Sequence, residues 1–306
     1  MSFLRKGSKD KEEPKGPRTT DVILVPPADC RPAAPPTLKP GDEEKLQEIV
    51  QHVAQHRQAH PCDPSYAPFE ETWLRDRNVY HRYLRATRGD VKSSKRRIIV
   101  RALRLTQDTL EWRREFKPEL IPPDEVAPEA ETGKHVLTGF DKEGRPILYL
   151  RPGRENTKTS PRQIRYMVWS LERGIDLMPP GQETLTIVVD FNGANLSTMP
   201  SLSTARHVAH ILQTHYVERL GRAFVCHMPK FISAFFSALS PFLDPVTKDK
   251  IRFNQPDMTE FVRPDQLDDQ FPGGQYPYQF DFAVYWPALV KACGIQPDGS
   301  RIPPQP

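Results

Sequence analysis

The sequence predicts an α/β protein in which a helical unit precedes an α/β unit. The most informative stretch is Leu185–Phe191, a β-branched run that is apolar on both faces, as in a buried parallel strand. A helical pattern follows over residues 198–217, and Arg222–Cys226 is a second buried strand. A strand, a helix and a strand in this order predict a βαβ unit with a right-handed crossover.

Residues 42–120 are predicted to form the helical unit. Asp42 is placed as an N-cap, and the apolar residues after it recur at helical spacing until the chain approaches Pro61. A second helix is expected over 78–87 and a third, much longer one over 91–116. The third helix has a broad apolar stripe that suits packing on other helices, comprising Ile98, Ile99, Ala102, Leu103, Leu105, Thr109, Leu110 and Trp112.

The spacing of the apolar residues along the chain changes after residue 121. Asp141–Gly144 supplies turn residues between two apolar runs, so residues 136–150 are expected to form a hairpin. Ser160 and Pro161 then begin a helix, and Trp286–Cys293 is expected to be the closing helix.

Both ends of the chain are predicted to lie outside the fold. The 306 residues include 33 prolines, and eight of these fall within residues 1–40. Such a composition buries too little apolar surface to offset the entropy of ordering, so 1–40 is expected to be a disordered tail, although Val22–Val25 could dock on the domain. We therefore expect a helical lobe over 41–120, an α/β domain over 121–293 and a disordered C-terminal tail over 294–306.

The sequence contains no apolar run long enough for a transmembrane helix, and its first residues lack the apolar region of a secretion signal. The four cysteines form no C-x-x-C pair, which favours reduced thiols and no zinc site. We therefore expect a cytoplasmic protein.

Positive charge is concentrated in one stretch. Residues 75–117 contain fourteen Lys or Arg and five acids, so they carry +9, while the whole chain carries +4. This basic stretch could face anionic lipid, nucleic acid or an acidic partner, or it could be a solvated helix surface. Nucleic acid is disfavoured because no recognition motif is present and aromatic residues are not interleaved with the basic ones.

The segment from Pro229 to Phe242 is unusually apolar. Pro229 suits the first turn of a helix whose polar residues fall on one narrow stripe. Such a helix is either buried between two layers, or it touches protein on one face and lipid on the other. Its bulky apolar residues are Phe231, Ile232, Phe235, Phe236, Leu239 and Phe242.

A short capped helix is predicted immediately afterwards, with Asp244 as the N-cap and Pro245 at the first helical position. Thr247 and Lys250 are three residues apart and share a face. A hydroxyl beside an ammonium can bind a phosphate, although most short capped helices are purely structural.

Several of these motifs, in this order, resemble the CRAL-TRIO lipid-binding family, and in particular its fungal phosphatidylinositol-transfer branch. The resemblance covers roughly residues 70–293. The segments that carry it are Tyr83–Val91, Leu110–Arg114, Asp141–Pro146, Val189-Asp190, Tyr216–Arg222, Met228–Lys230, Pro241–Ile251, Gly273-Gly274 and Tyr285-Trp286.

The resemblance implies a helical lobe beside an α/β lobe whose mostly parallel sheet floors an apolar lipid pocket, gated by a mobile helix. Residues 229–242 match the gate helix. The implied function is to bind phosphatidylinositol and exchange it between membranes, in support of phosphoinositide metabolism. No cofactor is implied, and the bound phospholipid is the ligand.

The resemblance also implies a headgroup site. Thr247 and Lys250 would contact the phosphate, Glu218 would accept hydrogen bonds from inositol hydroxyls, and Arg88 would keep one charge of a basic pair. Without the resemblance, Glu218 would be read as an exposed ion pair with Arg219 or Arg222.

The sequence departs from the family pattern in three places. Thr87 replaces one member of the basic pair, and Val217 stands where the family has proline. Asn195 and Ser197 occupy the region where members that bind phosphatidylcholine carry small hydroxyl residues. The last departure argues against a choline lipid and favours a protein that binds phosphatidylinositol alone or has another second ligand.

Rival functions have weaker support in the sequence. An enzyme is disfavoured because no G-x-S-x-G, P-loop or H-E-x-x-H motif is present. His207 and His210 could hold a metal, but a polar helix face explains them more simply. A carrier of sterol or another hydrophobic ligand and a non-transferring lipid sensor remain as alternatives of the same fold.

The expected partners follow from the same resemblance. They are the membrane surface, anionic phospholipid and lipid kinases, with no nucleic acid. We expect a monomer that associates transiently with membranes.

Overall fold

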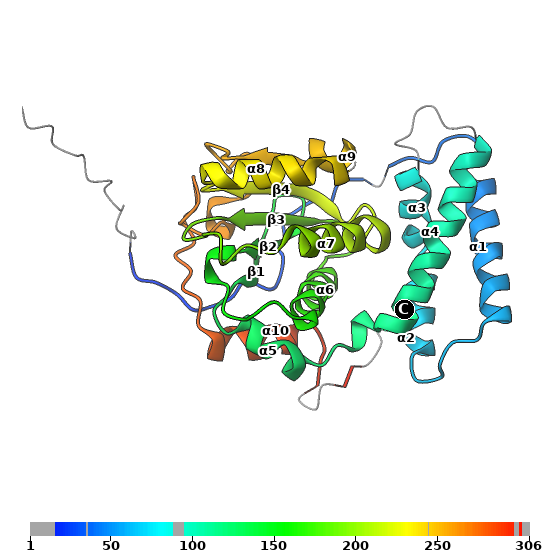
Figure 1. Ribbon diagram of the computed structural model, residues 1–306, viewed down its shortest axis with the longest axis horizontal. Coiled ribbons are helices and arrows are strands. Elements are labelled where there is room, and N and C mark those ends of the chain that lie inside the picture. The colour runs from blue at the N-terminus through cyan, green and yellow to red at the C-terminus, as the bar shows by residue number, and fades with distance from the viewer. Residues whose placement is uncertain (1–15, 35, 88–94, 244, 297–299, 302–306) are drawn as a thin grey trace, which may run out of the picture.

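Four helices form the N-terminal unit of the computed structural model, which describes residues 16–34, 36–87, 95–243, 245–296 and 300–301. They are α1 (Asp42–Ala59), α2 (Ala67–Arg75), α3 (Arg77–Ala86) and α4 (Lys95–Phe116) (Figure 1). The expected helices are present, and the nine-residue α2 is an addition that its sequence pattern was too short to predict. The expected start of the long helix at residue 91 lies outside the described residues.

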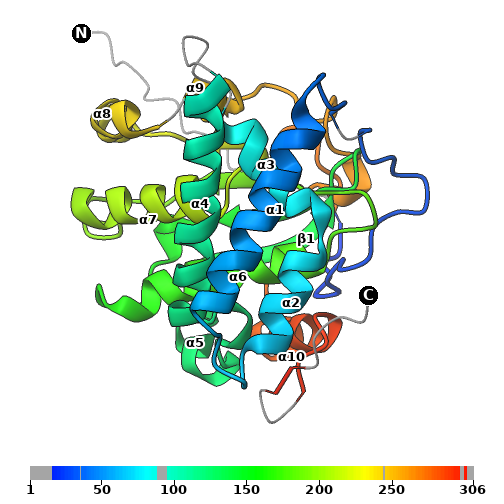
Figure 2. The same cartoon turned by 90° about the vertical axis from the view of Figure 1, so that its right-hand side faces the viewer.

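The core of the helical unit forms where α1, α3 and α4 meet. Its buried side chains include Leu46, Ile49 and Val53 of α1, Leu84 of α3 and Leu110 of α4. Burial of these apolar stripes stabilises the helices more than intrinsic propensity does. Viewed together, Figure 1 and Figure 2 show α4 between α1 and the α/β lobe, and α4 contacts both α1 and α7.

The α/β lobe is built on a five-stranded sheet with the order β1-β2-β3-β4-β5. β1 (His135–Phe140) and β2 (Pro146–Leu150) form the expected antiparallel hairpin, with Leu137 opposite Leu148. β3 (Leu185–Asp190) and β4 (Leu220–Cys226) are the expected parallel pair, with Val188 opposite Phe224. β5 (Ile251–Phe253) adds a short parallel edge strand that the sequence did not predict.

Within the described residues, six helices accompany the sheet, together with short 3-10 turns at 118–120, 152–154, 240–242 and 264–266. The helix expected after Ser160 and Pro161 is α6, and the crossover helix between β3 and β4 is α7. The closing helix, α10, begins four residues earlier than expected because Asp281 caps it by accepting from the Ala283 amide. The six are α5 (Pro123–Ala130), α6 (Pro161–Asp176), α7 (Leu202–His215), α8 (Lys230–Leu239), α9 (Pro245–Asp249) and α10 (Phe282–Ala292).

Strand β3 has two different faces. Thr186 and Val188 are buried, whereas Ile187 and Val189 are half-buried although they are apolar. Successive residues of a strand point to opposite faces, so Ile187 and Val189 share one face of the sheet. That face lines a large cavity, which is described below.

Residues 16–34 correct the expectation of a disordered tail over 1–40. The segment runs along the α/β lobe, where the Ile23 amide donates to Thr138 Oγ1 at 3.0 Å and the Gly139 amide donates to the Ile23 carbonyl. Arg18 pairs with Asp269 at 2.7 Å, and Val22–Leu24 pack on the main core. Strand β1 supplies a side-chain hydroxyl and a backbone amide as partners, which the average composition of the segment could not reveal.

The C-terminal tail expected over 294–306 is likewise attached in its described part. Ile295 is buried in the main core and bridges to Arg301, whose guanidinium pairs with Asp176 of α6. Among the described helices, none is both long enough and apolar enough to cross a membrane.

Candidate ligand cavity

A cavity of about 1100 Å³ lies on the face of the sheet that carries Ile187 and Val189. Its walls come from α6, α7 and α9, and from the inner sides of α3 and α4. The volume is slightly above the range of about 300–1,000 Å³ that is usual for ligand pockets, and the lining is predominantly apolar. Its apolar side chains include Leu150, Ile164, Met167, Leu171, Leu185, Val208, Ala209, Leu212, Leu243 and Val246.

Three predicted headgroup residues, Glu218, Thr247 and Lys250, line this one cavity. Thr247 and Lys250 belong to α9 and the residue after it, while Glu218 lies in the turn between α7 and β4. The Lys250 ammonium donates to the Leu220 carbonyl at 2.6 Å, which ties α9 to the start of β4. A carboxylate, a hydroxyl and an ammonium thus belong to residues that line the same apolar chamber.

The backbone of Glu218 is left-handed, with φ of 53°. This conformation is uncommon for a residue with a side chain and indicates a constrained turn. The Glu218 carboxylate accepts from Arg85 Nε at 2.5 Å, and Arg85 Nη2 donates to Glu183 at 2.9 Å. Burial lowers the pKa of Arg85, but the two carboxylates outweigh burial and raise it, so Arg85 is charged.

The pairing of Glu218 with Arg219 or Arg222, which the sequence alone favoured, does not occur. Arg219 Nη1 donates to the Glu183 carbonyl at 3.0 Å. Arg222 lies over the Phe261 ring at 4.0 Å and reaches toward Asp141. The partner of Glu218 is instead Arg85, which lies on α3 in the other lobe. Because the two residues are far apart in the sequence, no local pattern could predict their pairing.

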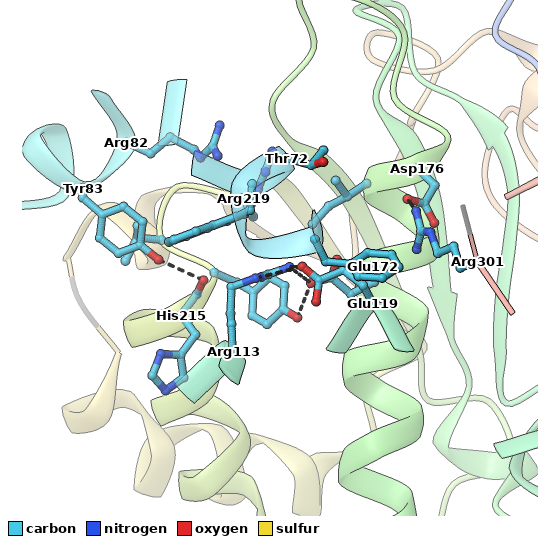
Figure 3. Close-up of a pocket in the computed structure, with 15 residues that line it drawn as sticks. Thr72, Arg82, Tyr83, Arg113, Glu119, Glu172, Asp176, His215, Arg219 and Arg301 are labelled. Atoms are coloured by element: carbon cyan, nitrogen blue, oxygen red, sulfur yellow. Dashed lines mark hydrogen bonds and ion pairs between the residues drawn. The ribbon is translucent and has the colours of Figure 1, made fainter. Parts of the chain in front are cut away.

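Both lobes hold the turn that carries Glu218. The Tyr216 hydroxyl donates to Glu172 at 2.6 Å, and the same carboxylate accepts from Arg113 at 3.1 Å. Tyr83 donates to the His215 carbonyl at 3.2 Å (Figure 3). Burial raises the pKa of Glu172, but the charge of Arg113 and the Tyr216 hydroxyl more than compensate, so its pKa is lowered and it is ionised.

The charged residues of the cavity are mostly basic. Two lining residues are acidic, Glu155 and Glu218. Seven are Arg or Lys, and Arg85 and Arg101 among them were recognised from sequence only as part of a basic stretch. Such a lining favours an anionic ligand. The seven are Arg85, Arg101, Lys134, Arg151, Arg206, Arg219 and Lys250.

The predicted gate helix corresponds to α8 and the turn that follows. Ile232 is fully buried against Phe191 and Val225, and Ser233 and Ser237 of the polar stripe are exposed. The side chains of the other predicted gate residues, Phe231, Phe235, Phe236, Leu239 and Phe242, fall outside the described part. Arg88 also lies outside the described residues, so its predicted role stays a prediction.

Two further pairs of residues were singled out from the sequence, one for lipid selectivity and one for metal binding. Asn195 accepts from the Ser197 amide at 2.9 Å within an exposed turn, and Ser197 lines the cavity. His207 and His210 belong to no cluster of three or more metal-binding side chains within the described ranges.

The sequence and the fold are similar to those of known proteins. A family model described as "CRAL/TRIO domain" matches residues 130–273. Phosphatidylinositol transfer protein PDR17 of Saccharomyces cerevisiae is 33% identical over 297 residues, covering 88% of this chain and 81% of that protein. CRAL-TRIO domain-containing protein C23B6.04c of Schizosaccharomyces pombe is 43% identical over 278 residues, covering 89% of this chain.

The chain spans 26% of the length of the Schizosaccharomyces pombe protein, which is therefore much longer. The fold is similar to that of the crystal structure of Sfh5, with a TM-score of 0.60 and 16% identity. That match covers 83% of this chain and 98% of the other, and it shows a shared fold.

Proposed function

This chain belongs to the CRAL/TRIO domain family, and on that premise we propose that it binds phosphatidylinositol and exchanges it between membranes. One observation carries the proposal: Glu218, Thr247 and Lys250 line a single, largely apolar cavity of about 1100 Å³. A neutral hydrophobic ligand needs none of these three polar groups. The relative named as a phosphatidylinositol transfer protein supports the same assignment.

The acyl chains would occupy the apolar part of the cavity. Moving a methylene group into water costs about 0.8 kcal/mol, so a lipid leaves a bilayer readily only if its chains stay in apolar surroundings. Side chains on the sheet, such as Ile187 and Val189, and on the facing helices supply those surroundings. The cavity therefore replaces the bilayer around the chains, and extraction has a small net cost.

The headgroup would lie against α9 and the turn at Glu218. The Lys250 ammonium suits the phosphodiester as a charged donor, and the Thr247 hydroxyl can donate a second hydrogen bond. The Glu218 carboxylate can accept hydrogen bonds from inositol hydroxyl groups. Arg85 keeps the carboxylate in place, because it donates to Glu218 and to Glu183 together.

The outer face of α4 would contact the membrane. Arg96, Arg97, Val100, Arg101 and Arg104 are exposed along its first turns, and Arg101 also lines the cavity. By contrast, other basic residues of the predicted stretch are turned inward, as Arg113 is. Each exposed arginine near an anionic bilayer contributes about 1 kcal/mol.

Mass spectrometry of lipid extracted from the purified protein tests the proposal. We expect phosphatidylinositol to be enriched over its share of the host membranes. Recovery of sterol alone, or of no inositol lipid, would overturn the headgroup assignment and favour a carrier of another hydrophobic ligand.

A further inference from the structure

A second, smaller cavity of about 120 Å³ lies between the helical unit and the α/β lobe (Figure 3). The helical unit contributes residues of α2, α3 and α4, and the α/β lobe contributes residues of α6 and of the turn before β4. Tyr216, Val217 and Arg219 line both this cavity and the large one. The turn that carries Glu218 is therefore a thin wall between the two cavities.

Four arginines line the small cavity, and two of them have close carboxylate partners. Arg113 Nη2 lies 2.5 Å from Glu119 and 3.1 Å from Glu172, and Arg301 pairs with Asp176. The three acidic residues of the lining are engaged in these pairs. Buried guanidinium groups are normally compensated in this way.

Arg82 is compensated only by longer contacts, because it donates a long hydrogen bond to Asp76 and forms a looser ion pair with Glu183. It is only 3% exposed, yet its nearest carboxylates are 3.5 Å away at Asp76 and 3.6 Å away at Glu183. Arg85 engages the Oε2 atom of Glu183 at 2.9 Å, whereas the Oε1 atom faces Arg82 and accepts no hydrogen bond within the described residues. Arg82 Nη1 has no hydrogen-bond partner in the part of the chain that the structure describes.

Arg219 is the second poorly compensated guanidinium. It donates to a main-chain carbonyl, that of Glu183, at 3.0 Å. Burial, together with the neighbouring charge of Arg82, lowers its pKa to about 9. In Figure 3, Arg82 and Arg219 lie on one side of the cavity, and the Asp176–Arg301 pair lies on the other.

We propose that the small cavity binds a small oxyanion, such as inorganic phosphate, between Arg82 and Arg219. Planar guanidinium groups present donors in a fork that matches oxyanion geometry. An anion at this place would add close acceptors to two neighbouring buried guanidinium groups, of which Arg82 has only long carboxylate contacts and Arg219 donates to a main-chain carbonyl. The cavity volume corresponds to about four water molecules at their share of liquid volume, which is sufficient for such an ion.

The site differs from the lipid headgroup site in position and in residues. The proposed ion lies behind the wall at 216–219, against α3, whereas Thr247 and Lys250 lie on the lipid side. Since Arg82 belongs to one lobe and Arg219 to the other, a bound anion would strengthen the contact between the lobes.

Thermal unfolding of the full chain in potassium phosphate, against potassium chloride at matched ionic strength, tests the site. We expect phosphate to produce a saturable rise in Tm of about 2–5 °C. Arg82→Met should abolish that rise, because it removes the unpartnered donor. Arg97→Met removes an exposed arginine of α4 that lines neither cavity, and it should leave the phosphate response unchanged.

Three outcomes would contradict the proposal. One is a wild-type Tm that responds equally to phosphate and chloride. Another is a phosphate response that persists in both Arg82→Met and Arg219→Met. The third is a response lost in Lys250→Ala but kept in Arg82→Met, which would place the ion in the lipid cavity. If Arg82→Met does not fold, Arg82→Lys keeps the charge without the fork, and at least a fivefold weaker phosphate affinity is expected.

Discussion

Arg85 Nε lies 2.5 Å from Glu218 Oε2, joining two residues that are 133 positions apart and belong to different lobes. This pair couples the predicted headgroup carboxylate to α3 of the helical unit. The same guanidinium reaches Glu183, so it fixes the position of Glu218 from outside the α/β lobe.

Replacing Arg85 with Met should impair lipid binding without removing any predicted ligand. Loss of a charged hydrogen-bond partner at a partly buried site costs about 1.5–3 kcal/mol, and Glu218 would lose its fixed orientation. A double-mutant cycle of Arg85→Met and Glu218→Gln, read out by phosphatidylinositol binding, measures the coupling. Additive effects would contradict a positioning role for Arg85.

The exposed arginines of α4 should control vesicle binding. Arg97→Gln combined with Arg104→Gln removes two charges from the exposed stripe, about 2 kcal/mol, which corresponds to about 30-fold weaker binding to vesicles rich in phosphatidylserine at low salt. Co-sedimentation measures the change. Arg75→Gln, on α2, is the control because it removes one exposed charge from another helix, and a loss of half that size there would show that overall charge rather than this face matters.

Stability should fall as the pH is lowered from 7 to 5. Burial, with neighbouring positive charges, lowers the pKa of His135 to about 3 and that of His215 to about 4. Because the unfolded chain takes up protons near pH 6.5 and the folded chain does so only below these values, protonation favours unfolding throughout this interval. Chemical unfolding at several pH values measures the trend.

Variants of single histidines test whether His215 contributes to this pH dependence. His215 stacks on Trp112, with ring centroids 4.3 Å apart, and His215→Asn should flatten the pH dependence between pH 7 and 5. His52→Asn is the control because it makes the same substitution at another partly buried histidine, whose ring hydrogen-bonds to Gln107. A wild-type slope retained in His215→Asn would contradict the assignment.

The N-terminal segment should contribute measurably to stability. Ile23 packs on the main core, so Ile23→Asp buries a charge and should lower the free energy of unfolding by about 2–3 kcal/mol. Val25→Asp is the matched control because Val25 is 76% exposed. Urea unfolding of the two variants compares them, and equal stabilities would show that the segment is not docked in solution.

Much of the α/β lobe could be predicted from sequence because its signals are local. β3 and β4 are apolar on both faces, and the hairpin of β1 and β2 surrounds clear turn residues. The helices α2 and α5 and the strand β5 are short, so their periodicity was too brief to recognise.

Only those residues of the candidate site that belong to recognised motifs were predicted from the sequence. Glu218, Thr247 and Lys250 fall within the matched segments, and the fold brings them to one cavity. The role of Arg85, the docking of residues 16–34 and the cavity between the lobes depend on contacts between distant segments. No local pattern encodes such contacts, so sequence reasoning placed Arg85 in a basic stretch and residues 16–34 in a tail.

The most direct test of the account is transfer of labelled phosphatidylinositol between donor and acceptor vesicles. Lys250→Ala removes an ammonium that lines the cavity, and Lys248→Ala removes an exposed ammonium of α9, two residues earlier, that does not line it. We predict that Lys250→Ala abolishes transfer and that Lys248→Ala retains the wild-type rate. Wild-type transfer by Lys250→Ala, with both variants folded, would contradict the proposed headgroup site.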